Sequence, residues 1–242
     1  MTTRKVQNPN QKGGNAFIWA IVAVIAIAAL VIGLIVSNGK SQRANAVREG
    51  MIDMSGINVE WAEDDNVIHL VGANPDAPTG QLFEDFSCGY CAELHKQTDA
   101  EMVEALKAGD INVDLHMMEF QDRGIEGHST RSLAAMLALI SRGDMDQAFS
   151  LRDFLYVNQQ ATAKYSNDDL ADLAADYGAS EDAVSDIREG AFIEKAKEVG
   201  AANLKLQEDE TGEAWTPRVW IDGKDAEDLG DREAWVTTLK NS

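Results

Sequence analysis

The sequence predicts an α/β fold in which a helical block separates the two halves of a small sheet, with one transmembrane helix in front. Three observations support this. Strand, helix and strand patterns follow one another over residues 81–118, and helical patterns then continue to about residue 206 before a strand returns at 217–223. The third observation is an uncharged apolar run over residues 17–36. With 242 residues, 45% of them apolar, the chain can form one domain of roughly 150–200 residues and an appendage.

The apolar run is the expected membrane anchor. Phe17 to Val36 contains no charged side chain and is about as long as a helix that crosses the ~30 Å hydrocarbon core. A cleaved signal peptide is the alternative, but its apolar region would span only about 7–15 residues and end close to a small-residue cleavage site. The nearest such site, Ala44-Asn45-Ala46, is separated from the run by Lys40 and Arg43. We therefore expect an uncleaved anchor.

Charge on either side of the anchor does not decide its orientation. Three basic residues flank it on each side: Arg4, Lys5 and Lys12 before it, and Lys40, Arg43 and Arg48 after it. The free amino terminus and the long domain that follows favour a cytoplasmic N-terminus and an extracytoplasmic C-terminal domain.

The predicted domain is strongly acidic. Residues 1–40 carry four basic side chains and no acidic ones, so residues 41–242 hold a net charge of −24. A phosphate backbone or an anionic lipid surface requires a basic partner, so the acidity argues against nucleic-acid binding and against headgroup binding by this domain. We interpret the acidity as a contribution to solubility.

Strand patterns begin after residue 58. They cover residues 66–71, 81–86 and 111–118, and a helical stretch from Cys88 to about Ala108 lies between the second and the third. This β-α-β order predicts a parallel strand pair joined by a right-handed crossover.

The helical block should contain several helices with recognisable starts. Helical spacing is clear over 129–141, 145–157 and 191–206; Ser166 opens another helix as part of a capping box with Asp169, and Ser180 caps the next. After the strand at 217–223, Asp231 is the expected cap of a closing helix with Trp235 and Leu239 on one face.

The chain has two cysteines, and they form one motif, Cys88-Gly89-Tyr90-Cys91, at the start of the first helix. Unpaired backbone N–H groups at a helix start stabilise a thiolate and can bring a cysteine pKa to ~3.5–7.5. Cys88 has that position, and Cys91 lies one turn further in. The spacing therefore predicts a redox pair in which Cys88 is the nucleophile and Cys91 resolves the mixed disulfide.

Two other interpretations of the cysteine pair are less consistent with the sequence. A structural zinc site needs four ligands, but there is no second cysteine pair, and His69, His95, His116 and His128 lack the usual spacing. A purely structural disulfide across three residues would restrict the unfolded chain very little. We expect neither a metal nor another cofactor.

Two segments resemble the DsbA-type thiol oxidoreductases of the thioredoxin superfamily, and in particular the membrane-anchored proteins of Gram-positive actinobacteria. They are residues 72–91, which end in the CxxC motif, and residues 215–223, which contain Thr216-Pro217. The resemblance covers roughly residues 66–240 and implies a thioredoxin-like sheet with an inserted helical subdomain. The expected organisation is a cytoplasmic N-terminus (1–16), an anchor (17–36), a linker (37–58), the first half of the thioredoxin-like domain (59–125), the helical insertion (126–208) and the second half (209–242).

The resemblance also suggests roles for residues around the motif. It implies that Pro217 is cis and lies against the CxxC, with Thr216 in contact with substrate, although an ordinary trans proline at a strand start fits the sequence too. The buried acid usual six residues before the first cysteine is replaced by Leu82. Glu84, on the same strand face as Leu82, is the candidate to assist proton transfer, or is simply solvated or salt-bridged; Asp85 points to the other face.

Two further side chains lie near the cysteines. His95 is on their helix face, where it either stabilises a thiolate or is only a partly exposed helix histidine, which we prefer. Tyr90 is better placed to tune Cys88 or contact substrate.

The resemblance implies an enzyme that forms disulfides in exported cysteine-containing proteins and is reoxidised by a quinone-linked membrane enzyme. Gly89-Tyr90 departs from the Pro-His of strong oxidases and resembles the pair in disulfide isomerases, which implies a milder oxidant. A reductase or isomerase on the same scaffold therefore remains an alternative. A non-catalytic protein-binding module is another.

Overall fold

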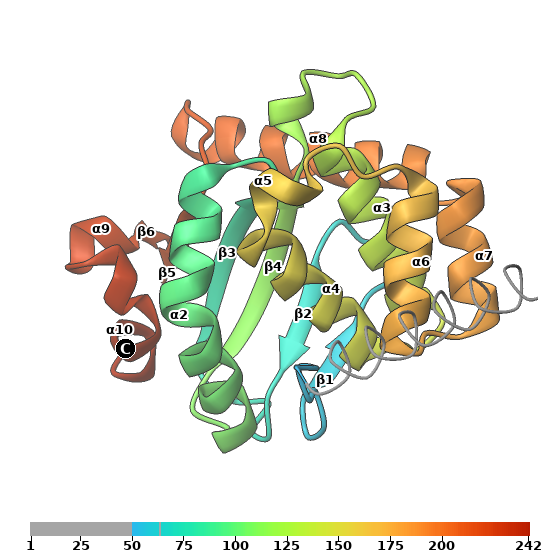
Figure 1. The fold of residues 1–242 in the computed structure, drawn as a ribbon. Helices are drawn as coiled ribbons and strands as arrows, with labels where there is room; N and C mark the ends of the chain where they lie inside the picture. The colour runs from blue at the N-terminus through green and yellow to red at the C-terminus, as the bar shows by residue number, and fades with distance from the viewer. Residues whose placement is uncertain (1–49, 63) are drawn as a thin grey trace, which may run out of the picture. The chain divides into compact units, whose positions relative to one another are not determined.

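The computed structural model describes residues 50–62 and 64–242 of the chain, which form a mixed six-stranded sheet with helices packed on it (Figure 1). The strand order is β1-β2-β4-β3-β5-β6. The strands are β1 (Asn58–Glu60), β2 (Ile68–Val71), β3 (Thr79–Asp85), β4 (Asn112–Met118), β5 (Arg218–Ile221) and β6 (Lys224–Asp225).

The β-α-β unit predicted from the sequence is confirmed. Strand β3 pairs in parallel with β4, with Leu82 opposite Leu115, and helix α2 (Gly89–Ala108) connects them. All other strand pairs in the sheet are antiparallel. Because β3 is central, with β4 on one side and β5 on the other, the cysteine motif that follows β3 lies next to the chain that enters β5.

The helical insertion lies between β4 and β5 and begins after a short 3₁₀ turn, η1 (Phe120–Asp122). Its helices are α3 (His128–Ser141), α4 (Met145–Val157), α5 (Gln159–Thr162), α6 (Asn167–Tyr177), α7 (Glu181–Glu189) and α8 (Ile193–Thr211). The capping box of Ser166 with Asp169 and the Ser180 cap are both confirmed. Figure 1 shows α4 and α5 beside α2, so the insertion reaches the start of the CxxC helix.

Helix α8 is longer than the sequence pattern predicts. It runs five residues beyond Leu206, to Thr211, through a polar stretch with no apolar periodicity. Its last turns are held by tertiary contacts, because Gln207 is buried, accepts a hydrogen bond from the Trp215 backbone N–H over 3.2 Å and donates one to the Trp215 carbonyl.

The C-terminal segment closes the fold with α9 (Ala226–Leu229), η2 (Arg232–Ala234) and α10 (Trp235–Lys240). The Asp231 side chain accepts a hydrogen bond from the Glu233 backbone N–H and so caps the 3₁₀ turn η2. Since η2 leads into α10, the cap lies one turn earlier than expected. Trp235 and Leu239, predicted to share one helix face, are both buried. The Trp235 indole N–H donates to the Thr98 hydroxyl on α2 over 3.2 Å and joins the closing helix to the CxxC helix.

Alternation along β3 places its side chains in two apolar clusters. Leu82 and Phe86 belong to the main core, which contains both cysteines, and Phe83 packs with Met118 and Trp220 in a smaller cluster. The face of β3 that carries Leu82 and Glu84 is therefore the face toward Cys91, as strand alternation predicts.

The predicted N-terminus (1–16) and anchor (17–36), and most of the linker (37–58), lie outside the described residues. Among the helices that the structure does describe, none has the length and apolarity needed to cross a membrane.

Candidate active site

Cys88 occupies the N-cap position of α2, as the sequence predicts. Its backbone is extended (φ −81°, ψ 116°), and helical geometry begins at Gly89. The side chain is 4% exposed, and its Sγ lies 3.3 Å from the Thr216 carbonyl oxygen. Cys91 is completely buried one turn further in, and both cysteines are free thiols. A partner must therefore reach the pair through Cys88.

The two thiols have opposite acidities. A hydrogen bond from the Cys91 thiol is the largest of the effects that lower the pKa of Cys88 to about 6; burial opposes it, while the Thr216 side chain and the backbone N–H groups of Cys91 and Tyr90 add to it. Burial raises the pKa of Cys91 well above its ordinary value, and the nearby Cys88 and Glu84 contribute to the increase. At neutral pH the thiolate therefore forms on Cys88, while Cys91 holds its proton.

The Thr216–Pro217 peptide bond is cis, as the resemblance implies. Both residues are buried, and within the described part of the chain the Thr216 hydroxyl has no partner other than Cys88, whose pKa the Thr216 side chain lowers. Thr216 thus presents two groups to Cys88: a carbonyl that accepts from the neutral thiol, and a hydroxyl able to donate to the thiolate.

Arg218, immediately after Pro217, fixes this loop and was not identified from the sequence. It is 2% exposed and forms a two-pronged pair with Asp225, with Nε–Oδ1 at 2.6 Å and Nη2–Oδ2 at 2.8 Å. Its guanidinium lies 3.7 Å from the centre of the Trp215 ring. The sequence pattern does not indicate that Arg218 holds the loop, because its acidic partner, Asp225, lies on the next strand.

Glu84 lies on the Cys91 side of the sheet but is not solvated. Its Oε2 accepts two hydrogen bonds from Arg152 on α4, from Nε at 3.1 Å and Nη2 at 2.7 Å, and both residues are 1% exposed. The third nitrogen of Arg152 binds Asp99 on α2 over 2.5 Å. Arg152 therefore links the sheet, the CxxC helix and the insertion, and the salt-bridged interpretation of Glu84 is confirmed.

The expectation that His95 is partly exposed is wrong. It is 3% exposed, its Nε2 lies 2.9 Å from Asp153, and its Nδ1 lies 3.3 Å from Asp99. Burial lowers the pKa of His95, but the Asp99 charge and the Asp153 hydrogen bond outweigh it, so the net change is an increase. α4 covers this face of α2, which sequence spacing on α2 alone does not indicate.

Asp85 points away from Glu84, as predicted, into a second polar cluster at the end of β3. It binds the Ser129 hydroxyl and accepts from the backbone N–H groups of Ser87 and Gln121. Burial raises the pKa of Asp85 to about 6. Its hydrogen bonds hold the short Phe86–Ser87 segment that leads to Cys88.

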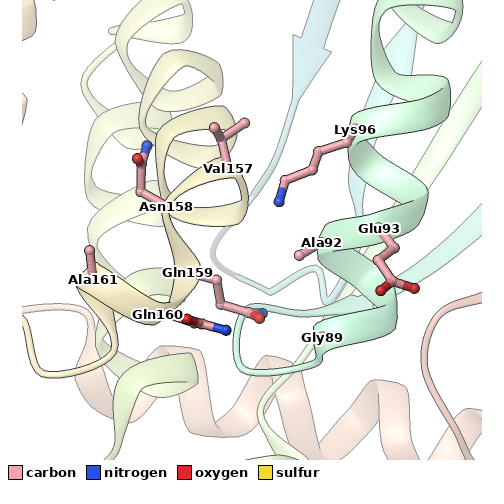
Figure 2. A pocket seen from close by; sticks show the side chains of 9 residues that line it. All are labelled: Gly89, Ala92, Glu93, Lys96, Val157, Asn158, Gln159, Gln160 and Ala161. Atoms are coloured by element: carbon pink, nitrogen blue, oxygen red, sulfur yellow. The ribbon is translucent and has the colours of Figure 1, made fainter.

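The insertion also contacts the cysteine loop directly, through Gln159 at the start of α5. Its side-chain amide donates to the carbonyls of Phe86 and Cys88, over 2.8 and 2.9 Å. Tyr90, between the cysteines, is 68% exposed. Beside Gly89 a groove of about 380 Å³ separates the exposed side of α2 from the α4–α5 junction (Figure 2).

The groups around the Cys88 sulfur are the Cys91 thiol, the carbonyl and hydroxyl of Thr216, and backbone N–H groups. Within residues 50–62 and 64–242, His, Cys, Asp and Glu side chains form no group of three or more that would hold a metal ion. A thiolate at Cys88 is a nucleophile that can attack the sulfur of a disulfide.

Comparisons with known proteins agree with this chemistry. Residues 66–241 match the thioredoxin family. The chain is 34% identical to MdbA, a thiol-disulfide oxidoreductase from Corynebacterium diphtheriae, with a TM-score of 0.73 over 80% of this chain and 98% of that one. For MdbA from Corynebacterium matruchotii the identity is 28% and the TM-score 0.74, over 84% and 98%.

A more distant solved structure supports the fold alone. DsbA from Mycobacterium tuberculosis is 17% identical, with a TM-score of 0.54 over 72% of this chain and 98% of that one. A search of curated protein sequences gives no match. Residues 66–241 match the thioredoxin family model, and the chain is 34% identical to a named oxidoreductase. This chain therefore belongs to the thioredoxin family, as a thiol-disulfide oxidoreductase similar to MdbA.

Proposed function

We propose that this enzyme introduces disulfides into exported proteins, tethered to the outer face of the cell membrane by residues 17–36. The observation that carries the proposal is the contrast between the two thiols: a buried Cys88 whose pKa is about 6 and a Cys91 whose pKa is well above its ordinary value. Because the thiolate stabilises the dithiol, the disulfide form readily accepts two electrons from a substrate dithiol.

In the proposed reaction, a substrate thiolate attacks Sγ of Cys88 in the Cys88–Cys91 disulfide. The S–S bond breaks, and the electron pair leaves on Cys91, which takes up a proton. A second substrate thiolate then attacks the substrate sulfur of the mixed disulfide and releases Cys88 as a thiolate. The substrate loses two electrons and gains a disulfide, and the enzyme is left as the dithiol.

The pKa of Cys88 favours this direction over reduction. At pH 7 a thiol of pKa about 6 is about nine-tenths ionised, whereas one near 9 is about 1% ionised. The extra ionisation stabilises the dithiol by on the order of 1 kcal/mol, which raises the reduction potential of the disulfide by roughly tens of millivolts. This gain is modest, consistent with a mild oxidant that carries Gly89-Tyr90 between its cysteines.

Three neighbouring residues have proposed roles in the exchange. Thr216 and Pro217 contact the backbone of the substrate beside Cys88, and the Thr216 hydroxyl donates to the departing thiolate. Glu84, beside Cys91, assists its proton transfer when the dithiol forms. Because Glu84 is paired with Arg152, it acts from a fixed position.

The proposed cellular arrangement is the one expected from the sequence. An anchor at 17–36 with residues 41–242 outside would keep the enzyme where thiols are oxidised and close to a quinone-linked membrane enzyme that returns Cys88 and Cys91 to the disulfide. No cofactor of its own is needed.

The test is the redox state of Cys88 and Cys91 in cells, trapped with a thiol-alkylating reagent. An oxidase is mainly disulfide at steady state, whereas a predominantly dithiol form would support the reductase or isomerase. A Cys91→Ser variant should accumulate mixed disulfides with exported proteins, and Cys88→Ser should not. Unchanged disulfide formation in cells that carry only Cys88→Ser would contradict the redox function. Protease accessibility of residues 41–242 in intact spheroplasts checks the orientation.

A further inference from the structure

A groove beside the cysteine loop has no part in the chemistry described so far. It opens between the exposed side of α2 and the junction of α4 with α5, and its volume is about 380 Å³. Gly89, the residue that follows Cys88, lines one end of the groove, so the groove begins one residue from the reacting cysteine (Figure 2). A substrate segment that extends past Cys88 on this side must pass along it.

The far wall of the groove carries three consecutive amide side chains, those of Asn158, Gln159 and Gln160. Gln159 donates its amide hydrogens to the carbonyls of Phe86 and Cys88. Its Oε1 therefore stays available, and it lies 4.0 Å from the position that a Cβ atom on Gly89 would occupy. Asn158 donates to the Phe154 carbonyl and keeps its oxygen free. Amide groups with spare donors and acceptors are suited to hydrogen bonding with the N–H and C=O groups of an extended peptide.

The near wall carries one cation, Lys96. Its side chain extends from α2 toward α4 across the groove, whereas the Glu93 carboxylate does not cross that space (Figure 2). Most basic side chains in this acidic domain are paired with carboxylates, but Lys96 has no ion pair within 4.0 Å among the described residues. An unpaired ammonium group in a polar groove offers a site for a carboxylate of a bound chain.

We propose that this groove binds an extended segment of the substrate polypeptide and that Lys96 favours substrates with an acidic residue at a fixed distance from the reacting cysteine. Lys96 lies eight residues after Cys88 on α2, which corresponds to about 12 Å along the helix. An extended chain advances about 3.3 Å per residue. The favoured Asp or Glu is therefore three to four residues from the substrate cysteine. The proposal rests on the proposed function, since it assumes polypeptide thiols as substrates.

The experiment uses the full-length protein with Cys91→Ser, so that each exchange stops at the mixed disulfide. Nine-residue peptides with a central cysteine are supplied as mixed disulfides with thionitrobenzoate. The Cys88 thiolate attacks the peptide sulfur, the S–S bond breaks, and thionitrobenzoate leaves with the electron pair and is followed by its absorbance. One aspartate is placed in turn at each position from four before to four after the cysteine.

We expect the rate to be highest, by about threefold over the other positions, with the aspartate three or four residues from the cysteine on one side. The negative net charge of the domain slows all the aspartate peptides to the same extent. Differences in rate among the aspartate positions therefore measure the contribution of the groove. The advantage should disappear in Lys96→Gln, diminish at high salt and remain in Lys224→Gln, which changes an exposed lysine on β6 outside the groove. Lys96→Glu should instead prefer lysine at the same position.

A rate that does not depend on the position of the aspartate, or an advantage that persists in Lys96→Gln, would overturn the proposal. Neither result would affect the proposed function, which depends on the exchange itself. Release of thionitrobenzoate from an uncharged peptide measures that exchange. If the uncharged peptide reacts no faster than it does with a Cys88→Ser, Cys91→Ser control, the redox function fails and the groove proposal fails with it.

Discussion

The Cys88 thiol lies 3.3 Å from the backbone carbonyl oxygen of Thr216, a residue 128 positions further along the chain. The contact joins the N-terminus of α2, which follows β3, to the loop before β5, which pairs with β3. Cys88 is therefore in contact with both halves of the thioredoxin-like domain. The helical insertion separates these halves in the sequence but not in space.

The Thr216 hydroxyl should help to set the acidity of Cys88. Thr216→Val keeps the shape of the side chain but removes the donor, so we expect the Cys88 titration to move above its value of about 6. The alkylation rate of Cys88 at pH 6 should fall about two- to fivefold. Thr216→Ser retains a hydroxyl and should behave like the wild type. Equal titrations of the Val and Ser variants, followed by thiolate absorbance, would show that the hydroxyl has no role.

The dithiol form should become more stable relative to the disulfide form as the pH rises. Above pH 6 Cys88 is a thiolate in the folded protein but a neutral thiol in the unfolded chain, whose pKa is near 9. The unfolded state then binds more protons, so the unfolding free energy of the dithiol form rises by about 1.4 kcal/mol per pH unit between about 6.5 and 8.

The disulfide form is the internal control for this measurement. Burial raises the pKa of Asp85 to about 6, so Asp85 affects the unfolding free energy with the opposite sign. Its stabilising contribution is lost as the pH rises from near 4 through 6. Because Asp85 is present in both redox forms, this effect cancels when the two forms are compared. Urea unfolding of the two forms from pH 5 to 8 measures the difference, and the Cys88→Ser variant should follow the pH dependence of the disulfide form. A constant difference across this range would mean that Cys88 is not a thiolate at neutral pH.

Arg152 should be among the most important side chains for stability outside the apolar core. Arg152→Met leaves Glu84 buried without its counter-charge and leaves Asp99 with His95 alone, which costs about 3–5 kcal/mol. Arg188→Met, which removes an arginine that binds Asp168 and Asp172 at the surface, should leave the urea midpoint unchanged. A small effect of Arg152→Met would show that these acids are protonated or hydrated in the variant.

Gln159 should stabilise the cysteine loop from the insertion. Gln159→Ala removes two hydrogen bonds to carbonyls of the loop and should lower the unfolding free energy by about 1–2 kcal/mol, with faster amide exchange at residues 86–91. Gln160→Ala changes the exposed neighbour and is the matched control. If both variants exchange at the wild-type rate, the loop does not depend on α5.

The residues that determine local structure and reactivity were evident in the sequence. The β-α-β order, the caps at Ser166 and Ser180 and the position of Cys88 at a helix start depend on neighbours within a few residues, which periodicity and capping patterns record. The lone CxxC motif and Thr216-Pro217 carried the resemblance, and with it the thioredoxin-like fold and the cis peptide.

Tertiary structure alone decided which distant side chains surround the motif. Glu84 is salt-bridged because α4 brings Arg152 to it, His95 is buried because the same helix covers α2, and α8 extends to Thr211 because Gln207 binds Trp215. Arg218 and Gln159 likewise act through partners on other elements. Each of these contacts depends on how elements pack across the sheet, and that packing leaves no periodic or local pattern in the sequence from which it can be predicted.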